Sequence, residues 1–244
     1  MFKIIAFDAD DTLWHNEPLF HATEAQFAEM LAHYHSAEWV RDRLFATEMK
    51  NLGHFGYGIK GFILSMIETA VELTESRIGG AEIQRILDWG HAMLLAPVDL
   101  LDGVRETIEA LAPEYRLMLL TKGDLFDQES KLARSGLGEH FHAVEIVSKK
   151  DPRTYASILA RHAVAPEEFL MVGNSLKSDV LPALEAGARA VHLPYALTWA
   201  HERVDDDALH GKEFARLESV RDLTGWLAER SPQAQNRSAD PFFR

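Results

Sequence analysis

The feature that most constrains this chain is a short apolar run that stops abruptly in acidic residues. Residues 2 to 7 read Phe-Lys-Ile-Ile-Ala-Phe, and Asp8-Ala9-Asp10-Asp11-Thr12 follows at once. The run has the length and composition of a buried parallel strand. Ligands of open α/β sheets bind at the carboxyl ends of the strands, so these acids would lie at the ligand-binding edge.

The spacing of the acids indicates what would bind there. Asp8 and Asp10 alternate along an extended segment, so both side chains can line one side of the loop. Carboxylates a few ångströms apart repel each other strongly unless a cation joins them. The strand end therefore predicts a hard divalent cation and an oxyanion substrate. The alternative is that Asp10, Asp11 and Thr12 only cap a following helix, because Asp and Thr are good N-caps.

Composition narrows the possible partners and the compartment. The formal charge of −13 argues against nucleic acid or an anionic membrane as the main partner, and an anionic substrate would need local positive charge in its site. The absence of Cys excludes disulfides, thiol nucleophiles and thiolate metal sites. The N-terminal apolar run is too short for a signal peptide, and no stretch approaches the roughly 20 apolar residues that span a bilayer. We therefore expect a cytoplasmic protein whose oligomeric state is open.

The chain changes character near residue 98. Before it, apolar residues at three-and-four spacing predict helices, joined in part by a glycine-rich connector over residues 51 to 58. These predicted helices are Pro18–Ala32, Glu38–Met49, Phe62–Leu73 and Ala81–Leu95. After it, apolar runs alternate with helical patterns. The predicted strands are Arg116–Leu120, His142–Val147, Phe169–Val172 and Ala188–Leu193, and the predicted helices are Val104–Leu111, Asp127–Ser135, Pro152–Arg161, Asp179–Ala186 and Val220–Glu229.

This alternation is typical of a Rossmann-like, doubly wound parallel sheet, so the fold class is α/β with an inserted all-helical segment. We expect residues 1–14 and 98–230 to form the α/β core domain. Residues 15–97 would form the helical domain, and residues 231–244 a polar C-terminal tail.

Chemistry-bearing residues follow each predicted strand of the core. Thr121-Lys122-Gly123-Asp124 follows the second strand, and Lys149-Lys150-Asp151-Pro152 follows the third. Gly173-Asn174-Ser175 follows the fourth, with Asp179 a few residues beyond. A phosphoryl-transfer site needs an oxygen nucleophile, an acid/base, a metal and donors for the phosphoryl oxygens, and each strand end supplies one of these parts.

The same four segments resemble the motifs of the haloacid dehalogenase-like hydrolase superfamily. The helical segment of this chain is inserted where that family carries a helical cap. The segments are Phe-Asp-Ala-Asp-Asp-Thr-Leu, Leu-Leu-Thr-Lys-Gly-Asp, Lys-Lys-Asp-Pro-Arg-Thr-Tyr and Val-Gly-Asn-Ser-Leu-Lys-Ser-Asp. The resemblance implies a Mg²⁺-dependent hydrolysis of a small phosphate ester through an aspartyl-phosphate. Because both acids of the first motif are present, it implies the phosphatase branch rather than the dehalogenases.

The resemblance also implies a role for individual residues. Asp8 would be the nucleophile, and Asp10 the acid that protonates the leaving alcohol and then activates water. Thr121, with the backbone N–H groups of Lys122 or Gly123, would hold phosphoryl oxygens. Lys150 would neutralise both nucleophile and phosphate. The implied metal ligands are Asp8, the backbone carbonyl of Asp10, Asn174 and Asp179.

The chain departs from the family pattern at two positions and leaves it ambiguous at a third motif. Asp11 stands where Gly is common, and we expect its side chain to point outward. Asn174 stands where Asp is commoner, which removes one negative charge from the metal site. Lys149 and Lys150 both align with variants of the third motif, and Lys150 keeps the Lys-x-Pro spacing. A phosphomutase and a catalytically weak binding or regulatory member remain the alternative functions.

Overall fold

The computed structural model describes residues 1 to 230, which divide into two compact units. The first contains Met1–His15, Asp99–Thr121 and the described residues from 135 onward, and the second contains Asn16–Val98 and Lys122–Arg134. The segment Lys122–Arg134 thus groups with the helical unit, although we expected it with the sheet. The predicted polar tail, residues 231–244, lies outside the described residues.

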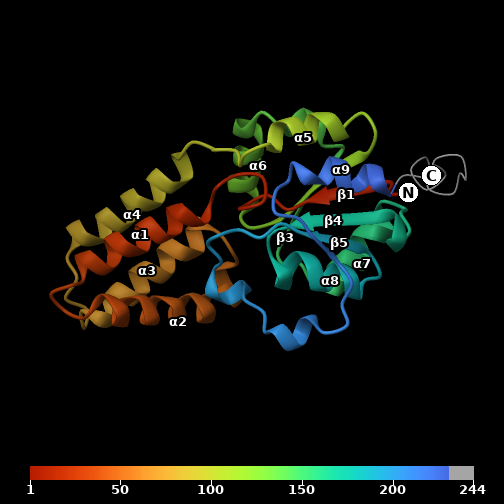
Figure 1. Ribbon diagram of the computed structural model, residues 1–244. Helices are drawn as coiled ribbons and strands as arrows, with labels where there is room; N and C mark the ends of the chain where they lie inside the picture. The colour runs from red at the N-terminus through yellow and green to blue at the C-terminus, as the bar shows by residue number, and fades with distance from the viewer. Residues whose placement is uncertain (231–244) are drawn as a thin grey trace, which may run out of the picture. The chain divides into compact units, whose positions relative to one another are not determined.

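Within the described residues, the first unit is built on a six-stranded sheet in the order β3-β2-β1-β4-β5-β6 (Figure 1). Its strands are β1 (Ile4–Phe7), β2 (Arg116–Lys122), β3 (Ala143–Val147), β4 (Phe169–Gly173), β5 (Arg189–His192) and β6 (Ala215–Arg216). Strand β1 runs parallel to its neighbours β2 and β4, and β5 runs parallel to β4 and β6. The predicted α/β class is confirmed, and β6 is an addition that the sequence pattern missed.

Helices cover both faces of this sheet, as the apolar strand runs require. Figure 1 shows α5 and α9 on one face and α7 and α8 on the other. These helices are α5 (Val104–Leu111), α7 (Pro152–Arg161), α8 (Leu181–Glu185) and α9 (Asp222–Glu229). Alternate strand residues such as Ile4, Met118 and Met171 pack with Tyr155 and Ile158 of α7 in one buried cluster. Their sequence neighbours in the same strands are also buried, because strand side chains alternate between faces.

The second unit is helical and has a core of its own. Its helices are α1 (Glu17–Met30), α2 (Ala37–Phe55), α3 (Ile59–Leu73), α4 (Gly80–Leu95) and α6 (Leu125–Ser135, of which Ser135 falls in the first unit). Phe27, Leu44, Met66 and Ile86, one from each of α1 to α4, are buried together. The glycine-rich connector is shorter than predicted, because α2 continues through residues 51 to 55. It ends only where Gly56 takes a positive φ of 71°.

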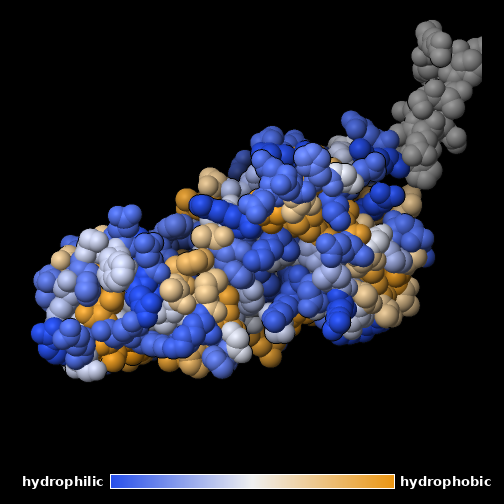
Figure 2. All heavy atoms as spheres, turned by 90° about the horizontal axis from the view of Figure 1, so that it is seen from below, coloured by the Kyte–Doolittle hydropathy of each residue, from blue (hydrophilic) through white to orange (hydrophobic). Residues whose placement is uncertain are grey.

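The surface is polar over most of the face that Figure 2 presents, in keeping with the formal charge of −13. Within residues 1 to 230, none of the helices combines the length and apolar character that crossing a bilayer requires.

Candidate active site

Strand β1 places Asp8 at the carboxyl edge of the sheet, between β2 and β4. The backbone N–H of Asp8 donates to the carbonyl oxygen of Val172 at 2.9 Å, which extends the β1–β4 ladder, and the residue is only 8% exposed. The loop turns at Asp11, whose φ of 60° is a left-handed conformation that Gly, Asn and Asp tolerate best. Asp11 is buried, so the expectation that it points outward is wrong. The turn keeps it inside the loop, with its N–H donating to the carbonyl of Trp14.

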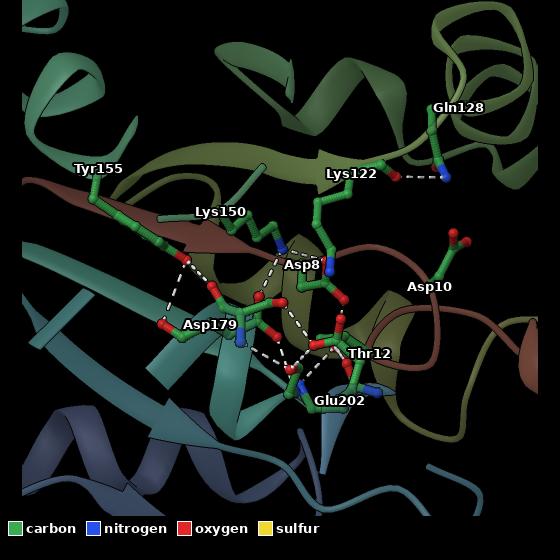
Figure 3. Close-up of polar contacts among 12 residues, drawn as sticks. Asp8, Asp10, Thr12, Lys122, Gln128, Lys150, Tyr155, Asp179 and Glu202 are labelled. Atoms are coloured by element: carbon green, nitrogen blue, oxygen red, sulfur yellow. Dashed lines mark hydrogen bonds and ion pairs between the residues drawn. The ribbon is translucent and has the colours of Figure 1, made fainter. Parts of the chain in front are cut away.

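Lys150 lies between two buried carboxylates. Its ammonium group donates to Asp8 Oδ1 at 2.5 Å and to Asp179 Oδ1 at 2.6 Å (Figure 3). The side chain of Lys150 is buried, whereas Lys149 is exposed. Helix α7 begins at Pro152, as its position in the sequence predicted, and Lys150 is the residue that faces Asp8.

Thr12 joins Asp8 to Asn174 across the edge of the sheet. The hydroxyl oxygen of Thr12 lies 3.1 Å from Asp8 Oδ2 and 3.2 Å from Asn174 Oδ1. The backbone N–H of Asn174 donates to the same hydroxyl oxygen at 3.0 Å. On the other side, the carbonyl oxygen of Asn174 lies 3.0 Å from Nε2 of His192 in β5. The side-chain oxygen of Asn174 is therefore held on the side of Asp8.

Asp179 lies in a π turn, Leu176–Val180, and α8 begins only at Leu181, so the helix predicted over residues 179–186 starts later than expected. Such one-residue insertions are frequent at functional sites. Asp179 is 1% exposed, and its Oδ2 accepts the backbone N–H of Ser175 at 2.9 Å. Gly173 makes room for this carboxylate, because a Cβ at position 173 would lie 2.2 Å from the same Oδ2.

Asp10 contacts a different partner. Its Oδ1 accepts the indole N–H of Trp14 at 2.7 Å, and the Trp14 side chain is almost fully buried. In Figure 3 the Asp10 carboxyl group lies apart from the contacts among Asp8, Lys150 and Asp179. The predicted acid/base role of Asp10 stays a prediction.

The two predicted phosphate-binding residues of β2 lie in different units. Thr121 is buried. It lies two residues beyond Leu119, which pairs with Phe7 of β1. It therefore lies at the same edge of the sheet as Asp8. Lys122 belongs to the helical unit, where its ammonium nitrogen lies 4.3 Å from the ring centroid of Tyr57. The predicted contacts of both residues with phosphate stay predictions.

The electrostatics of the cluster show a shortage of positive charge. Burial raises the pKa of Asp8 to about 7; the Asp179 and Asp10 carboxylates act in the same direction and Lys150 opposes them. Burial alone would lower the pKa of Lys150, but Asp179 and Asp8 outweigh it, so that this pKa is raised. Lys150 therefore stays charged, while one ammonium group is insufficient to keep Asp8 fully ionised at neutral pH.

This donor set fits a hard divalent cation. Among residues 1 to 230, no three His, Asp or Glu side chains gather as a metal cluster by themselves. The candidate set is two carboxylates, Asp8 and Asp179, and the amide oxygen of Asn174, linked through Lys150 and Thr12. Mg²⁺ binds through few protein oxygens and keeps several waters, and a second cation would supply the positive charge that Asp8 lacks.

Sequence reasoning missed Glu202, which lies in the segment after β5. Its Oε2 accepts the hydroxyls of Ser175 and Ser178 at 2.5 and 2.6 Å. It also missed the buried Tyr155 of α7, whose hydroxyl donates to the carbonyl of Ser178 at 3.0 Å. No spacing in the sequence connects Glu202 to the fourth strand. The serines three residues apart after a strand were a visible N-cap signal, and Ser175 does accept the N–H of Ser178.

Comparisons with known proteins identify the family of the chain. A model of the family described as haloacid dehalogenase-like hydrolase matches residues 2 to 187. A crystal structure of a haloacid dehalogenase-like family hydrolase from Xanthomonas campestris is 40% identical, with a TM-score of 0.84. That alignment covers 97% of this chain and 94% of the other. The chain belongs to the haloacid dehalogenase-like hydrolases, and the predicted family is confirmed.

Two curated relatives are named as phosphatases. The phosphoserine phosphatase of Thermus thermophilus is 44% identical over 88 residues, which is 34% of this chain and 35% of that protein. The match thus spans about a third of the length of the Thermus protein. The glyceraldehyde 3-phosphate phosphatase of Methanopyrus kandleri is 24% identical over 237 residues, 94% of this chain and 100% of that protein. These names agree with the phosphatase branch expected from Asp10.

Proposed function

We propose that the chain is a phosphatase that hydrolyses a small soluble phosphomonoester through a phosphorylated Asp8, with Mg²⁺ as cofactor. The observation that carries the proposal is the placement of Asp8, buried at the end of a central strand. Its two carboxylate oxygens contact Lys150 on one side and Thr12 on the other. A buried carboxylate held by a single cation is placed to act as a nucleophile toward an electrophilic, anionic group.

In the first step, a carboxylate oxygen of Asp8 attacks the phosphorus atom, and the bond from phosphorus to the ester oxygen breaks. Asp10 donates a proton to the departing alkoxide, which leaves as an alcohol. Lys150 offsets the combined negative charge of Asp8 and the phosphoryl oxygens. The Thr121 hydroxyl and the backbone N–H of Lys122 or Gly123 would bind the remaining phosphoryl oxygens.

In the second step, water attacks the phosphorus of the phosphorylated Asp8. Asp10, now ionised, takes a proton from that water, and Asp8 is released as a carboxylate together with inorganic phosphate. The hydrogen bond from the Trp14 indole N–H holds the Asp10 carboxyl group in one orientation for both proton transfers.

The residues that would hold Mg²⁺ are Asp8, the backbone carbonyl of Asp10, Asn174 and Asp179. When bound, the ion would keep Asp8 ionised and polarise the phosphoryl group. Lys150 would remain between Asp8 and Asp179, where its ammonium group limits their mutual repulsion.

The substrate class follows from the relatives and from the charge of the chain. Both named relatives are phosphatases whose names specify a phosphorylated amino acid or a phosphorylated three-carbon sugar, so we propose a metabolite phosphate ester as the substrate. The formal charge of −13 disfavours polyanionic substrates such as nucleic acid. The helical unit as a cap and a cytoplasmic location stay predictions.

The proposal is tested by phosphate release from a panel of metabolite phosphates, with Asp8→Asn as the decisive variant. Asp8→Asn and an excess of EDTA are each expected to abolish turnover. Acid quenching of the wild type during turnover should leave a phosphoryl group on the peptide that contains Asp8. Asp102→Asn is the matched control and should keep wild-type activity, because Asp102 is an exposed partner of Arg221. Full turnover by Asp8→Asn would refute the mechanism, and sugar-phosphate isomerisation without phosphate release would indicate a mutase.

A further inference from the structure

Glu202 reaches the π turn of the candidate site from a separate part of the chain. It ends a short 3₁₀ segment, Ala200–Glu202, in the loop after β5, and in Figure 3 it lies beside the residues around Asp179. One of its oxygens, Oε2, accepts the hydroxyls of both Ser175 and Ser178. Both serines are 7% exposed.

The hydrogen-bond arrangement needs an acceptor oxygen that both serine hydroxyls can reach, and Glu202 supplies it. Each hydroxyl has a single proton, and both protons are directed to Oε2 of Glu202. The lone pairs of Ser175 Oγ are then available to accept the backbone N–H of Ser178 at 2.9 Å, which closes the turn. Without Glu202, both buried hydroxyls would lose the acceptor oxygen that they share.

Ser175 transmits this arrangement to the metal-side residues. It directly follows Asn174, and its own backbone N–H donates to Asp179 Oδ2 at 2.9 Å. Asp179 also closes the turn through its backbone N–H, which donates to the carbonyl of Ser175 at 2.9 Å. A shift of Ser175 would therefore move the two side chains that supply metal oxygens in the proposed function.

The segment that carries Glu202 is itself fixed. The Lys177 ammonium donates to the carbonyl oxygen of His201 at 2.7 Å, next to Glu202 in sequence. At the other end of the segment, the Tyr195 hydroxyl lies 2.6 Å from Nδ1 of His15. Contacts on both sides thus hold Glu202 against the turn, so little conformational entropy is lost when it binds the two serines.

We propose that Glu202 is a positioning residue for the metal site. It fixes the Ser175–Ser178 turn so that the oxygens of Asn174 and Asp179 keep their places, and its charge partly replaces the carboxylate that Asn174 lacks. The inference deepens the proposed function and depends on it for the identity of the ion. Groups that hydrogen-bond a metal ligand commonly change metal affinity by about 10- to 100-fold when removed. Glu202 acts one contact further out, through Ser175, so we expect the low end of that range.

The test is Mg²⁺ binding by titration calorimetry on the purified chain without substrate. Glu202→Ala is expected to weaken binding by about 10-fold, within the range for such groups. Glu202→Gln keeps an acceptor oxygen but loses the charge, so it should weaken binding less. Ser178→Ala, which removes one of the two donors, should fold even if Glu202→Ala does not, and it should also weaken binding. Glu218→Gln is the matched control, since Glu218 is exposed and pairs only weakly with Arg216.

Hydrogen exchange gives a readout without metal. The amides of Ser178 and Asp179 should exchange faster in Glu202→Ala than in the wild type, while those of the β1–β4 ladder stay unchanged. At saturating Mg²⁺, kcat should recover toward the wild-type value in Glu202→Gln. If Glu202→Ala keeps the wild-type Mg²⁺ affinity and the wild-type hydrogen-exchange rates, the inference is overturned while the proposed function stands. A wild-type chain that binds no Mg²⁺ would overturn the proposed cofactor, and the inference with it.

Discussion

Gly173→Ala is the sharpest test of the packing that places Asp179. A Cβ at position 173 would lie 2.2 Å from Oδ2, 2.4 Å from Cγ and 2.8 Å from Cβ of Asp179. Ordinary van der Waals contact begins at 3.4 Å, so the carboxylate must move by more than 1 Å. It is fixed on both oxygens, to Lys150 at 2.6 Å and to the Ser175 N–H at 2.9 Å, and it cannot move that far and keep both bonds.

The expected cost follows from these contacts. Overpacking a tight site costs about 1–3 kcal/mol, and breaking a buried ion pair costs about 3–5 kcal/mol. Because Lys150 keeps its contact with Asp8, only part of the ion-pair cost applies. We therefore expect the two effects together to lower the free energy of unfolding by about 3 kcal/mol. In a chain of this size, that corresponds to a melting temperature lower by about 6–12 °C.

The assay is urea unfolding together with phosphate release. Gly225→Ala is the matched control, since a Cβ there meets nothing within 4 Å and Ala is the better helix former in α9. In an Asp179→Ala background, Gly173→Ala should cost at least about 1 kcal/mol less, because the clashing carboxylate is gone. The reasoning is refuted if Gly173→Ala unfolds at the wild-type urea concentration and keeps full activity.

Two further predictions concern the acids that follow β1. The pKa of Asp8 is raised from 3.8 to about 7 in the folded, metal-free chain, so the fold favours protonated Asp8. The stability gained from this protonation is complete below about pH 4 and is lost as the pH rises through about 7. In EDTA, the melting temperature of Asp8→Asn should therefore exceed that of the wild type at about pH 8, and the difference should be far smaller at about pH 5. Equal melting temperatures of variant and wild type at both pH values would contradict the raised pKa. Trp14→Phe removes the N–H donor of Asp10, so kcat should fall about 10-fold, the equivalent of one charge-assisted hydrogen bond. An unchanged kcat in phosphate release would contradict this role.

The strands that carry the site were predictable because of where they lie. Strands β1 and β4 are buried on both faces, so they read as continuous apolar runs, and the polar residues after them mark the edge of the sheet. Strand β6 has only two residues, too few to form a pattern. The continuation of α2 past Gly53 was missed because glycine lowers helix propensity without forbidding a helix.

The contacts within the site could not be predicted from the sequence, for a different reason. Thr12 reaches Asn174 across 162 positions of chain, and Glu202 reaches Ser175 from another loop, so no local spacing encodes either contact. A π turn differs from the first turn of a helix by one residue, and hydrophobic periodicity cannot detect that over the few residues around Asp179.

The charge balance of the site explains why an amide at position 174 is compatible with a metal site. Asp8 already has a pKa near 7 beside Asp179 and Asp10, so a third carboxylate in contact range of Thr12 would further disfavour its ionised form before metal binds. Asn174 supplies an oxygen without that repulsion. In the proposed function, Glu202 would add negative charge from behind the two serine hydroxyls, where the turn separates it from Asp8. With Asp8 as the proposed nucleophile, Asn174 would exchange some metal affinity for a carboxyl group that is easier to ionise.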